Sequence, residues 1–311
     1  MRILITGCNG FVGRHLAAEL LQARHEVFGL DVGPPSPALS FPVATGDICD
    51  PGALQRAVRG FCPDGCIHLA GIASVPLCSQ QPELAFRINV LGTLNVLDAL
   101  QKKSPDARLL VVSTAQVYGF SPSSWLDETV PPQPDSQYAL SKFCAETASF
   151  LRARESRLSV FAVRPVNHIG PGQTTHFVIS SFASQLAAIV RGRADSRLQV
   201  GNVDSERDFL DVRDVVRGYR LLLEKGVSGE CYNLASGRLI PIRHALDVLC
   251  RIAGISPTRE LDPARFRPTE RSLTLRCAKL QQATGWIAAI PLEQTLRDIY
   301  EDALKSGPGG T

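Results

Sequence analysis

The sequence predicts an α/β protein with a doubly wound parallel sheet and a smaller C-terminal α/β domain. Three features of the 311-residue chain support this fold class. Short β-branched runs alternate with helical patterns in the first half, as in sheets whose parallel strands are joined by right-handed helical crossovers. A glycine-rich turn joins the first of these runs to the first helix. After residue 166 the alternation loosens into loops and shorter elements.

The first half contains runs that are apolar throughout, which is typical of strands buried on both faces of a parallel sheet. Between them, leucine and alanine recur at helical spacing. In chain order, we expect a strand over 2–6, a helix over 14–24, strands over 26–31 and 65–71, a helix over 82–103, a strand over 108–114, a helix over 138–154 and a strand over 158–165.

The second half is less regular and predicts a separate unit. A loop over 166–177 precedes a helix over 178–192, and Asp211 is a candidate N-cap for a later helix. A further buried strand is expected over 230–236. We therefore expect a first domain over 1–166 to which elements near 206–236 return, a second domain mainly over 167–305, and a disordered tail over 306–311.

Composition excludes several classes of protein. Lys and Arg number 33 against 30 Asp and Glu, and no basic run is interleaved with aromatic residues, so we expect no nucleic-acid partner. Nine scattered cysteines without a CxxC pair predict free thiols in a reducing compartment and no metal site. The apolar run at the N-terminus is too short for a signal peptide, and none approaches the ~20 residues that span a bilayer. We expect a cytoplasmic protein without a membrane partner.

A glycine-rich turn between the first strand and the first helix predicts a dinucleotide site. Gly7, Gly10 and Gly13 have G-x-x-G-x-x-G spacing. Glycines let this backbone turn tightly and approach a pyrophosphate, whose charge is stabilised at the helix N-terminus. The alternative is a purely structural turn. If the turn binds a dinucleotide, the loop and the start of the helix also contribute the contact residues Asn9, Phe11 and Val12.

Asp31 closes the second strand and bears on the choice of cofactor. A carboxylate there accepts hydrogen bonds from the adenosine ribose and repels a 2′-phosphate. No arginine follows in "DVGPPS". We therefore expect NAD(H) as the preferred cofactor, with NADP(H) as the alternative. Asp47 and Ile48 are expected to flank the adenine, and the competing interpretation of Asp31 is a surface residue in a turn.

Tyr138 and Lys142 form a Y-x-x-x-K pair on the helix over 138–154. Residues four apart share one face of a helix. We expect the Lys142 ammonium to favour the phenolate and so to lower the Tyr138 pKa from about 10, as general acid-base catalysis requires.

Together these motifs resemble the extended short-chain dehydrogenase/reductases, the NAD-dependent epimerase/dehydratase family, over nearly the whole chain. "TGCNGFVG", "HLAG", "STAQVYG", "YALSK" and "RPVN" occur in the order of that family. The resemblance implies that Thr114 binds the reacting sugar oxygen, Tyr138 exchanges its proton and Lys142 holds the nicotinamide ribose. A packing or capping role is the alternative for Thr114. The resemblance also implies cofactor contacts at Leu69, Ala70, Gly71 and Pro165.

The second half resembles the branch of this family that handles GDP-activated deoxyhexoses. By this resemblance Asn167, Arg207, Arg267 and Glu270 hold the nucleotide, diphosphate and ribose, and the backbone of Val178 lies near the base. Arginine forks suit a diphosphate. The alternative for Arg207 is an ion pair with one of three nearby acids. We interpret the three histidines near these motifs as structural or loop residues. The acids are Asp204, Asp208 and Asp211, and the histidines are His68, His168 and His176.

Gln116 separates two reactions of this branch. A 4,6-dehydratase of the family carries a carboxylate just after the strand-end Thr or Ser, where this chain has Ala115 and Gln116. A methyl group and an amide cannot transfer the protons of an elimination at neutral pH. Reduction of a ketone needs only a hydride and one proton. We therefore expect a 4-ketoreductase that converts GDP-4-keto-6-deoxy-D-mannose into GDP-D-rhamnose, with Gln116 as a neutral substrate contact.

Three other functions are weaker alternatives. A nucleotide-sugar 4-epimerase with tightly bound NAD uses the same three residues, whereas a 4,6-dehydratase and a non-catalytic NAD-binding protein fit the motifs less well. The loop over 120–137 is expected to cover the sugar, with Asp127 and Glu128 as solvent-facing acids; contact with the substrate is the alternative for these two residues. By analogy with the family, helices near 83–102 and 138–154 pair in a homodimer.

Overall fold

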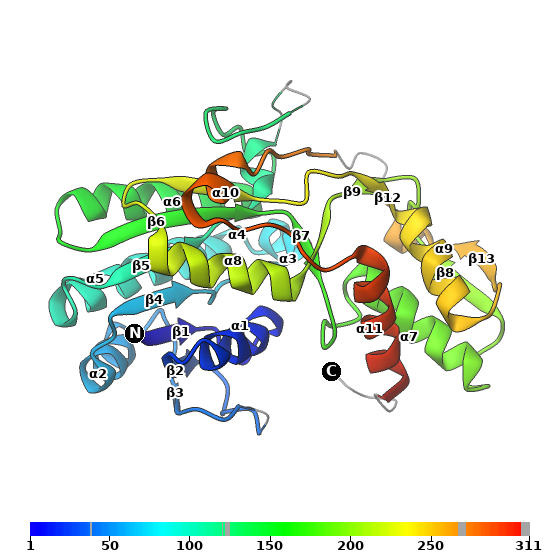
Figure 1. Ribbon diagram of the computed structural model, residues 1–311, viewed down its shortest axis with the longest axis horizontal. Helices are drawn as coiled ribbons and strands as arrows, with labels where there is room; N and C mark the ends of the chain where they lie inside the picture. Colours follow the sequence, from blue (N-terminus) through cyan, green and yellow to red (C-terminus); the bar gives the residue numbers. More distant parts are fainter. Residues whose placement is uncertain (38, 120, 122–124, 267–271, 306–311) are drawn as a thin grey trace. The chain divides into compact units, whose positions relative to one another are not determined.

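The computed structural model describes residues 1–37, 39–119, 121, 125–266 and 272–305 (Figure 1). The chain divides into two compact units. The first contains residues 1–166, 215–234 and 275–287, and the second contains the described residues of 167–214, 235–274 and 288–305. The sequence placed 275–287 in the second domain, whereas the structure returns this segment to the first. Arg267, Glu270 and the predicted tail lie outside the described residues.

The first unit contains a seven-stranded parallel sheet, which confirms the predicted fold class. Its strand order is β11-β6-β5-β4-β1-β2-β3. The direction of winding reverses beside β1, and in such sheets ligands bind where the order reverses. The strands are β1 (Arg2–Thr6), β2 (Glu26–Asp31), β3 (Val43–Thr45), β4 (Gly65–His68), β5 (Arg108–Val112), β6 (Ser159–Pro165) and β11 (Cys231–Leu234).

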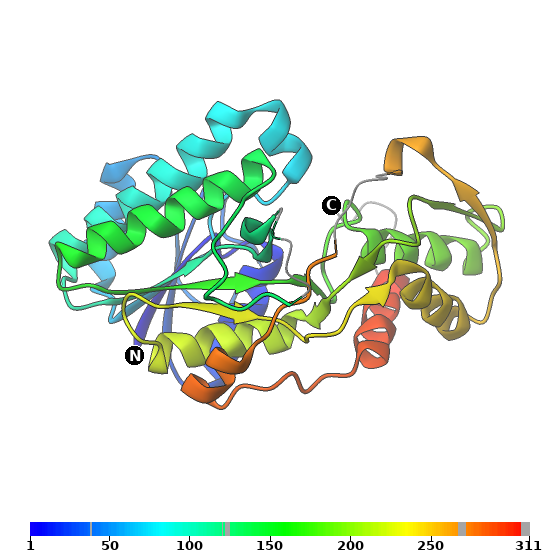
Figure 2. The same ribbon diagram turned by 90° about the horizontal axis from the view of Figure 1, so that it is seen from above.

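Helices cover both faces of this sheet. Leu54, Leu97 and Leu109 share one buried core, which places α2 and α5 on the same face. On the other face, Arg220 of α8 pairs with Glu19 of α1. Figure 2 shows α5 and α6 on one side of the strands and α8 and α10 on the other. The helices are α1 (Phe11–Gln22), α2 (Pro51–Phe61), α3 (Val75–Gln80), α4 (Pro82–Phe86), α5 (Thr93–Lys103), α6 (Gln137–Arg154), α8 (Val212–Lys225) and α10 (Ala278–Thr284).

A π-helical turn, η1 (Arg87–Gly92), interrupts the helix predicted over 82–103. The sequence indicated one continuous α-helix, but α4 and α5 flank this wider turn. Two contacts accompany it. The Asn89 side chain is buried and hydrogen-bonded outside its own helix, and a Cβ on Gly92 would lie 2.5 Å from Cδ1 of Ile48. Short π-turns of this kind occur frequently at functional sites.

The second unit is built from three two-stranded sheets and the helices around one apolar core. Phe182, Leu246 and Leu296 are at most 2% exposed and hold α7, α9 and α11 together. The sheets pair β7 (Asn167–Ile169) with β10 (Phe209–Asp211), β8 (Arg197–Val200) with β13 (Thr258–Leu261), and β9 (Glu206–Arg207) with β12 (Ile240–Pro241). The helices are α7 (Val178–Val190), α9 (Ile242–Ala253), α11 (Leu292–Lys305) and the 3-10 turn η3 (Pro263–Arg265). Across the described ranges, no helix is long and apolar enough to span a membrane.

A buried ion pair joins α6 to the sheet of the first unit. The Arg164 guanidinium donates to both carboxylate oxygens of Glu146, at 2.5 and 3.2 Å, and the two side chains are only 5% and 2% exposed. Arg164 also donates to the Tyr118 hydroxyl at 2.9 Å, and Tyr118 donates to the Asn233 amide oxygen at 2.8 Å. Both charges are thereby compensated, and four elements are tied together: α6, β6, β11 and the 3-10 turn η2 (Ala115–Tyr118).

Breaking this pair should be strongly destabilising. Arg164→Met leaves the Glu146 carboxylate buried without its partner, and we expect the free energy of unfolding to fall by about 3–5 kcal/mol. Urea denaturation followed by circular dichroism measures the change. The control is Arg152→Met, which removes the half-exposed partner of Asp98 from α6, the helix that carries Glu146. This change should cost at most about 1 kcal/mol. Similar losses in both variants would contradict this account.

Candidate active site

The glycine turn after β1 forms a cradle that side chains would fill. Gly7 has a φ of +75°, and a Cβ there would lie 2.8 Å from the Ala70 nitrogen. A Cβ on Gly13 would lie 2.5 Å from the Gly7 oxygen. Gly10 is the N-cap of α1 and provides no side-chain cap. The turn therefore exposes backbone at a helix N-terminus, where a pyrophosphate binds favourably, and these residues fit a dinucleotide.

Asp31 and Asn9 hold the next turn of the chain against the glycine loop. The Asp31 carboxylate accepts the N–H of Asn9 at 2.9 Å and that of Gly33 at 3.3 Å. The Asn9 amide donates to the Pro34 carbonyl at 3.0 Å and accepts the Ser36 N–H at 3.1 Å. Sequence position suggested only that Asn9 contacts the cofactor. The structure gives its side chain a further role, because it fixes the segment that follows Asp31.

The other predicted cofactor contacts lie where strands of the sheet end. Parallel strands bring their carboxyl ends to one edge of the sheet, so these residues and the glycine loop share that edge. Ile48 is 4% exposed and packs against η1, so the structure gives it a core contact in addition to its predicted role. The residues are Asp47 and Ile48 after β3, Leu69, Ala70 and Gly71 after β4, and Pro165 at the end of β6.

Thr114 and Tyr138 lie together at this edge. Thr114 is the N-cap of η2, and its hydroxyl accepts the Gln116 N–H at 3.3 Å. Tyr138 is in the first turn of α6, only 9% exposed, and forms a hydrogen bond with the Thr114 side chain. Burial raises the pKa of Tyr138 to about 12, the Thr114 bond opposes the rise, and the nearby Cys78 thiol adds to it. At neutral pH this phenol retains its proton.

The expected effect of Lys142 on Tyr138 is wrong for the protein alone. We expected its charge to lower the Tyr138 pKa, but desolvation dominates and raises it. Burial also lowers the pKa of Lys142 to about 8, against a smaller opposing contribution from Cys78. Both shifts have one cause, since the charged forms of phenol and amine alike lose hydration on burial.

Asn89, which was not predicted from the sequence, connects these residues to the loop after β4. Its amide nitrogen donates to Ser141 Oγ at 2.9 Å and to the Ile72 carbonyl at 3.1 Å, and its oxygen accepts the Ile72 N–H at 2.8 Å. Ser141 in turn donates to the Tyr138 carbonyl at 2.8 Å. A Cβ on Gly71 would lie 2.8 Å from the Asn89 oxygen and 3.7 Å from Nζ of Lys142. The only sequence signal was a polar residue within an apolar helical run.

His68 has a structural environment, in agreement with its interpretation from sequence. Its Nδ1 lies 2.6 Å from Thr6 Oγ1, and its Nε2 lies 2.9 Å from Thr93 Oγ1. Burial, together with a smaller contribution from the Lys142 charge, lowers the pKa of His68 to about 3. The ring is therefore neutral at physiological pH and joins β1, β4 and α5 through hydrogen bonds. Within the described residues, no group of three or more His, Cys, Asp or Glu is arranged to hold a metal.

One of the two loop acids, Glu128, differs from expectation. The Asp127 carboxylate accepts the N–H and hydroxyl of Thr129. Glu128 is not simply solvent-facing, because its carboxylate accepts the Asn233 N–H at 2.6 Å.

Gln116 is half-buried on η2. Residues 120 and 122–124 of the predicted covering loop lie outside the described residues.

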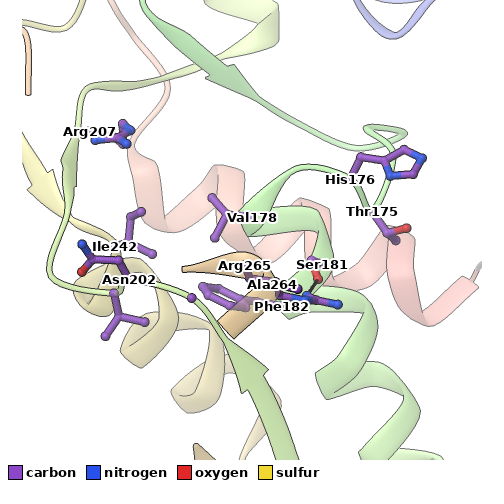
Figure 3. A pocket seen from close by; sticks show the side chains of 12 residues that line it. Thr175, His176, Val178, Ser181, Phe182, Asn202, Arg207, Ile242, Ala264 and Arg265 are labelled. Carbon is purple, nitrogen blue, oxygen red and sulfur yellow. Dashed lines mark hydrogen bonds between the residues drawn. The ribbon is translucent and has the colours of Figure 1, made fainter. Parts of the chain in front are cut away.

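The second unit has a cavity of about 420 Å³ (Figure 3). Two predicted substrate contacts, Val178 and Arg207, line it, whereas Asn167 is exposed on β7 and does not. The sequence missed Arg265 and Phe182. His176 lies in the turn before α7, as expected of a loop residue, and also lines this cavity. Apolar and cationic side chains in one cavity suit a ligand with a planar ring and negative charge. The lining residues are Thr175, His176, Val178, Ser181, Phe182, Gly201, Asn202, Val203, Arg207, Ile242, Ala264 and Arg265.

Arg207 lies on β9 and donates to the Glu206 carbonyl at 2.7 Å. Burial lowers its pKa, although a guanidinium remains charged throughout the physiological range. The acids considered as alternative partners bond elsewhere: Asp204 to Arg243, Asp208 to Ser236 and Gly237, and Asp211 to Arg213. The Arg207 guanidinium and apolar side chains such as Val178 thus line the same cavity.

Comparison with known proteins agrees with this arrangement. Residues 3–235 match the NAD dependent epimerase/dehydratase family. The chain belongs to this family. It is 38% identical over 304 residues to the GDP-6-deoxy-D-mannose reductase of Pseudomonas aeruginosa, covering 97% of this chain and 96% of that protein. It is thus an NAD(P)-dependent enzyme of nucleotide-sugar modification.

Two solved structures are similar over nearly the whole chain. RMD from Pseudomonas aeruginosa, complexed with NADPH, is 36% identical with a TM-score of 0.87 and covers 98% of this chain and 99% of its own. The UDP-glucose 4-epimerase of Thermotoga maritima, solved with UDP-glucose, is 27% identical with a TM-score of 0.87 and the same coverage. Reductases and epimerases of the family therefore share this fold.

The lowered Lys142 pKa makes stability depend on pH. Its folded pKa of about 8 lies below the ordinary 10.5, so the unfolded chain binds more protons between these values. The free energy of unfolding of the wild type should therefore rise with pH across this window. We expect Lys142→Met to be more stable than the wild type by about 1–3 kcal/mol at pH 7, with the difference shrinking toward pH 10.5.

Urea denaturation of both proteins at several pH values, without added nucleotide, checks this. Lys102→Met is the control, because Lys102 is an exposed residue on α5 whose loss removes the same charge. A Lys142→Met protein that is less stable than the wild type at pH 7 would show that the ammonium is not penalised by burial.

Proposed function

We propose that this enzyme reduces the 4-keto group of a nucleotide-activated 6-deoxyhexose, converting GDP-4-keto-6-deoxy-D-mannose into GDP-D-rhamnose with NAD(P)H. The observation that carries the proposal is the turn after β5. Thr114 and Tyr138 are present and hydrogen-bonded. The two positions directly after Thr114 hold Ala115 and Gln116. No carboxylate follows Thr114 to remove and return the protons of an elimination. The reductase from Pseudomonas aeruginosa, at 38% identity, supports the same reaction.

The protein residues supply the proton and the positioning. Thr114 and Tyr138 bind the carbonyl oxygen together, and the Tyr138 phenol protonates it as the alkoxide forms. A raised pKa suits this step, since the phenol holds its proton until the oxygen becomes more basic. Lys142 holds the nicotinamide ribose, and Tyr138 is reprotonated from solvent. A bound reduced nicotinamide supplies the hydride for C4.

The substrate's nucleotide is proposed to occupy the cavity of the second unit. Arg207 binds the diphosphate, for which its planar fork of donors is suited. Val178 and Phe182 provide apolar surface for the base. Asn167, Arg267 and Glu270 remain proposed contacts from sequence, and Gln116 is a proposed neutral contact to the sugar.

We propose NADH as the preferred cofactor. The Asp31 carboxylate is fixed at the end of β2 by two backbone N–H groups, where it would accept from ribose hydroxyls and repel a 2′-phosphate. The solved relative from Pseudomonas aeruginosa holds NADPH, so NADPH is the competing candidate.

A homodimer through α5 and α6 is also proposed. Leu140 and Leu151 of α6 and Leu91 of η1 are large apolar side chains that are 37–57% exposed. Exposed apolar residues on neighbouring helices favour pairing with a second copy.

The decisive assay follows absorbance of the reduced nicotinamide with GDP-4-keto-6-deoxy-D-mannose. We expect stoichiometric oxidation of NADH by the wild type and a loss of about 10²–10⁴-fold in rate for Tyr138→Phe, which removes the proton donor. The Tyr300→Phe protein is the matched control, because Tyr300 is a buried tyrosine of α11 in the core of the second unit and has no proposed role in the reaction.

The competing function is a nucleotide-sugar 4-epimerase, favoured by the similarity to the enzyme from Thermotoga maritima. That outcome would show no net oxidation of NADH. It would also show NAD retained by the purified protein and interconversion of UDP-glucose and UDP-galactose without added cofactor.

Cofactor preference can be tested by binding alone. Asp31→Asn removes the charge that repels a 2′-phosphate, and we expect the ratio of Kd for NADPH to Kd for NADH to fall about tenfold. Asn9→Ala frees the turn after Asp31 without changing charge and should weaken both nucleotides alike. Fluorescence titration of the reduced nicotinamide measures both constants. If the ratio of the two Kd values is unchanged in Asp31→Asn, Asp31 does not determine the choice of cofactor.

A further inference from the structure

Arg265 lines the same cavity and lies in a segment that is held closely against β8. Asp262 accepts the Ala264 N–H at 2.9 Å and so begins η3, and its other oxygen accepts Nε of Arg265 at 2.9 Å. The Asp262 N–H donates to the Val200 carbonyl at 2.8 Å. A Cβ on Gly201 would lie only 2.4 Å from the Arg265 carbonyl oxygen. Glycine at 201 therefore permits this approach.

The Arg265 guanidinium is anchored on two sides. Besides the bond to Asp262, its Nη1 donates to Ser181 Oγ of α7 at 2.8 Å (Figure 3). A guanidinium has five N–H donors, and these bonds use two of them. The remaining donors are on Nη1 and Nη2, at the end of the side chain. Anchoring reduces the entropy lost when those donors bind a ligand.

The end of a guanidinium presents two parallel donors, which match a pair of adjacent acceptors. Guanine carries such a pair in O6 and N7, whereas uracil and thymine carry O4 beside a carbon. Val178 and Phe182 line the same cavity as Arg265, so the cavity offers apolar surface as well as the anchored fork. Arg207, on β9, is a separate cation for the diphosphate. The two arginines thus suit two different parts of a nucleotide.

We propose that Arg265 determines the base specificity of this enzyme by binding the O6/N7 edge of guanine. The inference rests on the proposed function, since it assigns the base of the nucleotide that the cavity holds. It concerns binding alone, so it can be tested without turnover.

Calorimetric titration with GDP and with UDP gives the test. The wild type should bind GDP more tightly than UDP by about 10–100-fold, the discrimination expected from one bidentate contact to guanine. Arg265→Met should lose this preference through weaker GDP binding, while its affinity for UDP changes less than about threefold. Arg265→Lys keeps the charge without the fork and should also lose the preference.

One further variant tests the anchoring of the Arg265 guanidinium, and another serves as its control. Ser181→Ala removes one anchor of the guanidinium and should reduce the preference for GDP by a few-fold. Arg197→Met is the matched control, because Arg197 is 65% exposed on β8, pairs with Glu260 and does not line the cavity. It should leave both affinities unchanged.

The possible results separate this inference from the proposed function. Equal weakening of GDP and UDP in Arg265→Met would assign Arg265 to the diphosphate and overturn the inference, as would unchanged GDP binding. A wild type that binds neither nucleotide would overturn both proposals. Guanine preference that depends on Arg265, in a protein that oxidises no NADH with the keto sugar, would uphold the inference and overturn only the reductase.

Discussion

The buried ion pair between Glu146 and Arg164 sets the geometry on which the candidate site depends. Tyr138, Lys142 and Glu146 are spaced four residues apart, so they occupy one face of α6. Fixing Glu146 against β6 therefore fixes the rotation of the helix that carries the other two. Arg164 also holds Tyr118 at the end of η2, the turn that begins at Thr114. One guanidinium thereby orients both partners of the Thr114–Tyr138 hydrogen bond.

Placing these groups in a dry environment has an energetic consequence. Desolvation raises the Tyr138 pKa and lowers that of Lys142, so both groups are less readily charged than in water. Beside these two groups, the buried Asn89 amide is satisfied by Ser141 and by the Ile72 backbone. Functional sites commonly retain such unfavourable groups at the expense of stability.

The fold and the glycine loop could be predicted from sequence because their signals are local. Uninterrupted apolar runs predict buried strands, and a glycine spacing between a strand and a helix predicts a backbone cradle. The π-turn at η1 was not predictable, because it accompanies contacts that Asn89 and Gly92 make with residues far along the chain. Arg265 was missed for the same reason, since its place in the cavity depends on the pairing of β8 with β13. Arg267 and Glu270, predicted from a motif, lie outside the described residues.

The sign of the Tyr138 pKa shift illustrates a further limit. Helical spacing correctly predicts that Tyr138 and Lys142 share a face, but it does not show how much water either side chain retains. Attraction between a phenolate and an ammonium lowers the tyrosine pKa only if both charges form, and burial opposes each of them.

This outcome bears on the direction of the reaction. A reductase begins its cycle by giving a proton to a carbonyl oxygen, so a phenol that remains protonated in the free protein starts in the correct state. An epimerase begins by removing a proton from a hydroxyl, for which the same tyrosine would first have to ionise. With the Tyr138 pKa raised to about 12, that ionisation is unfavourable at neutral pH in the protein alone. The environment of Tyr138 thus favours proton donation in the free protein, whereas the amide at Gln116 disfavours an elimination and does not separate a reductase from an epimerase.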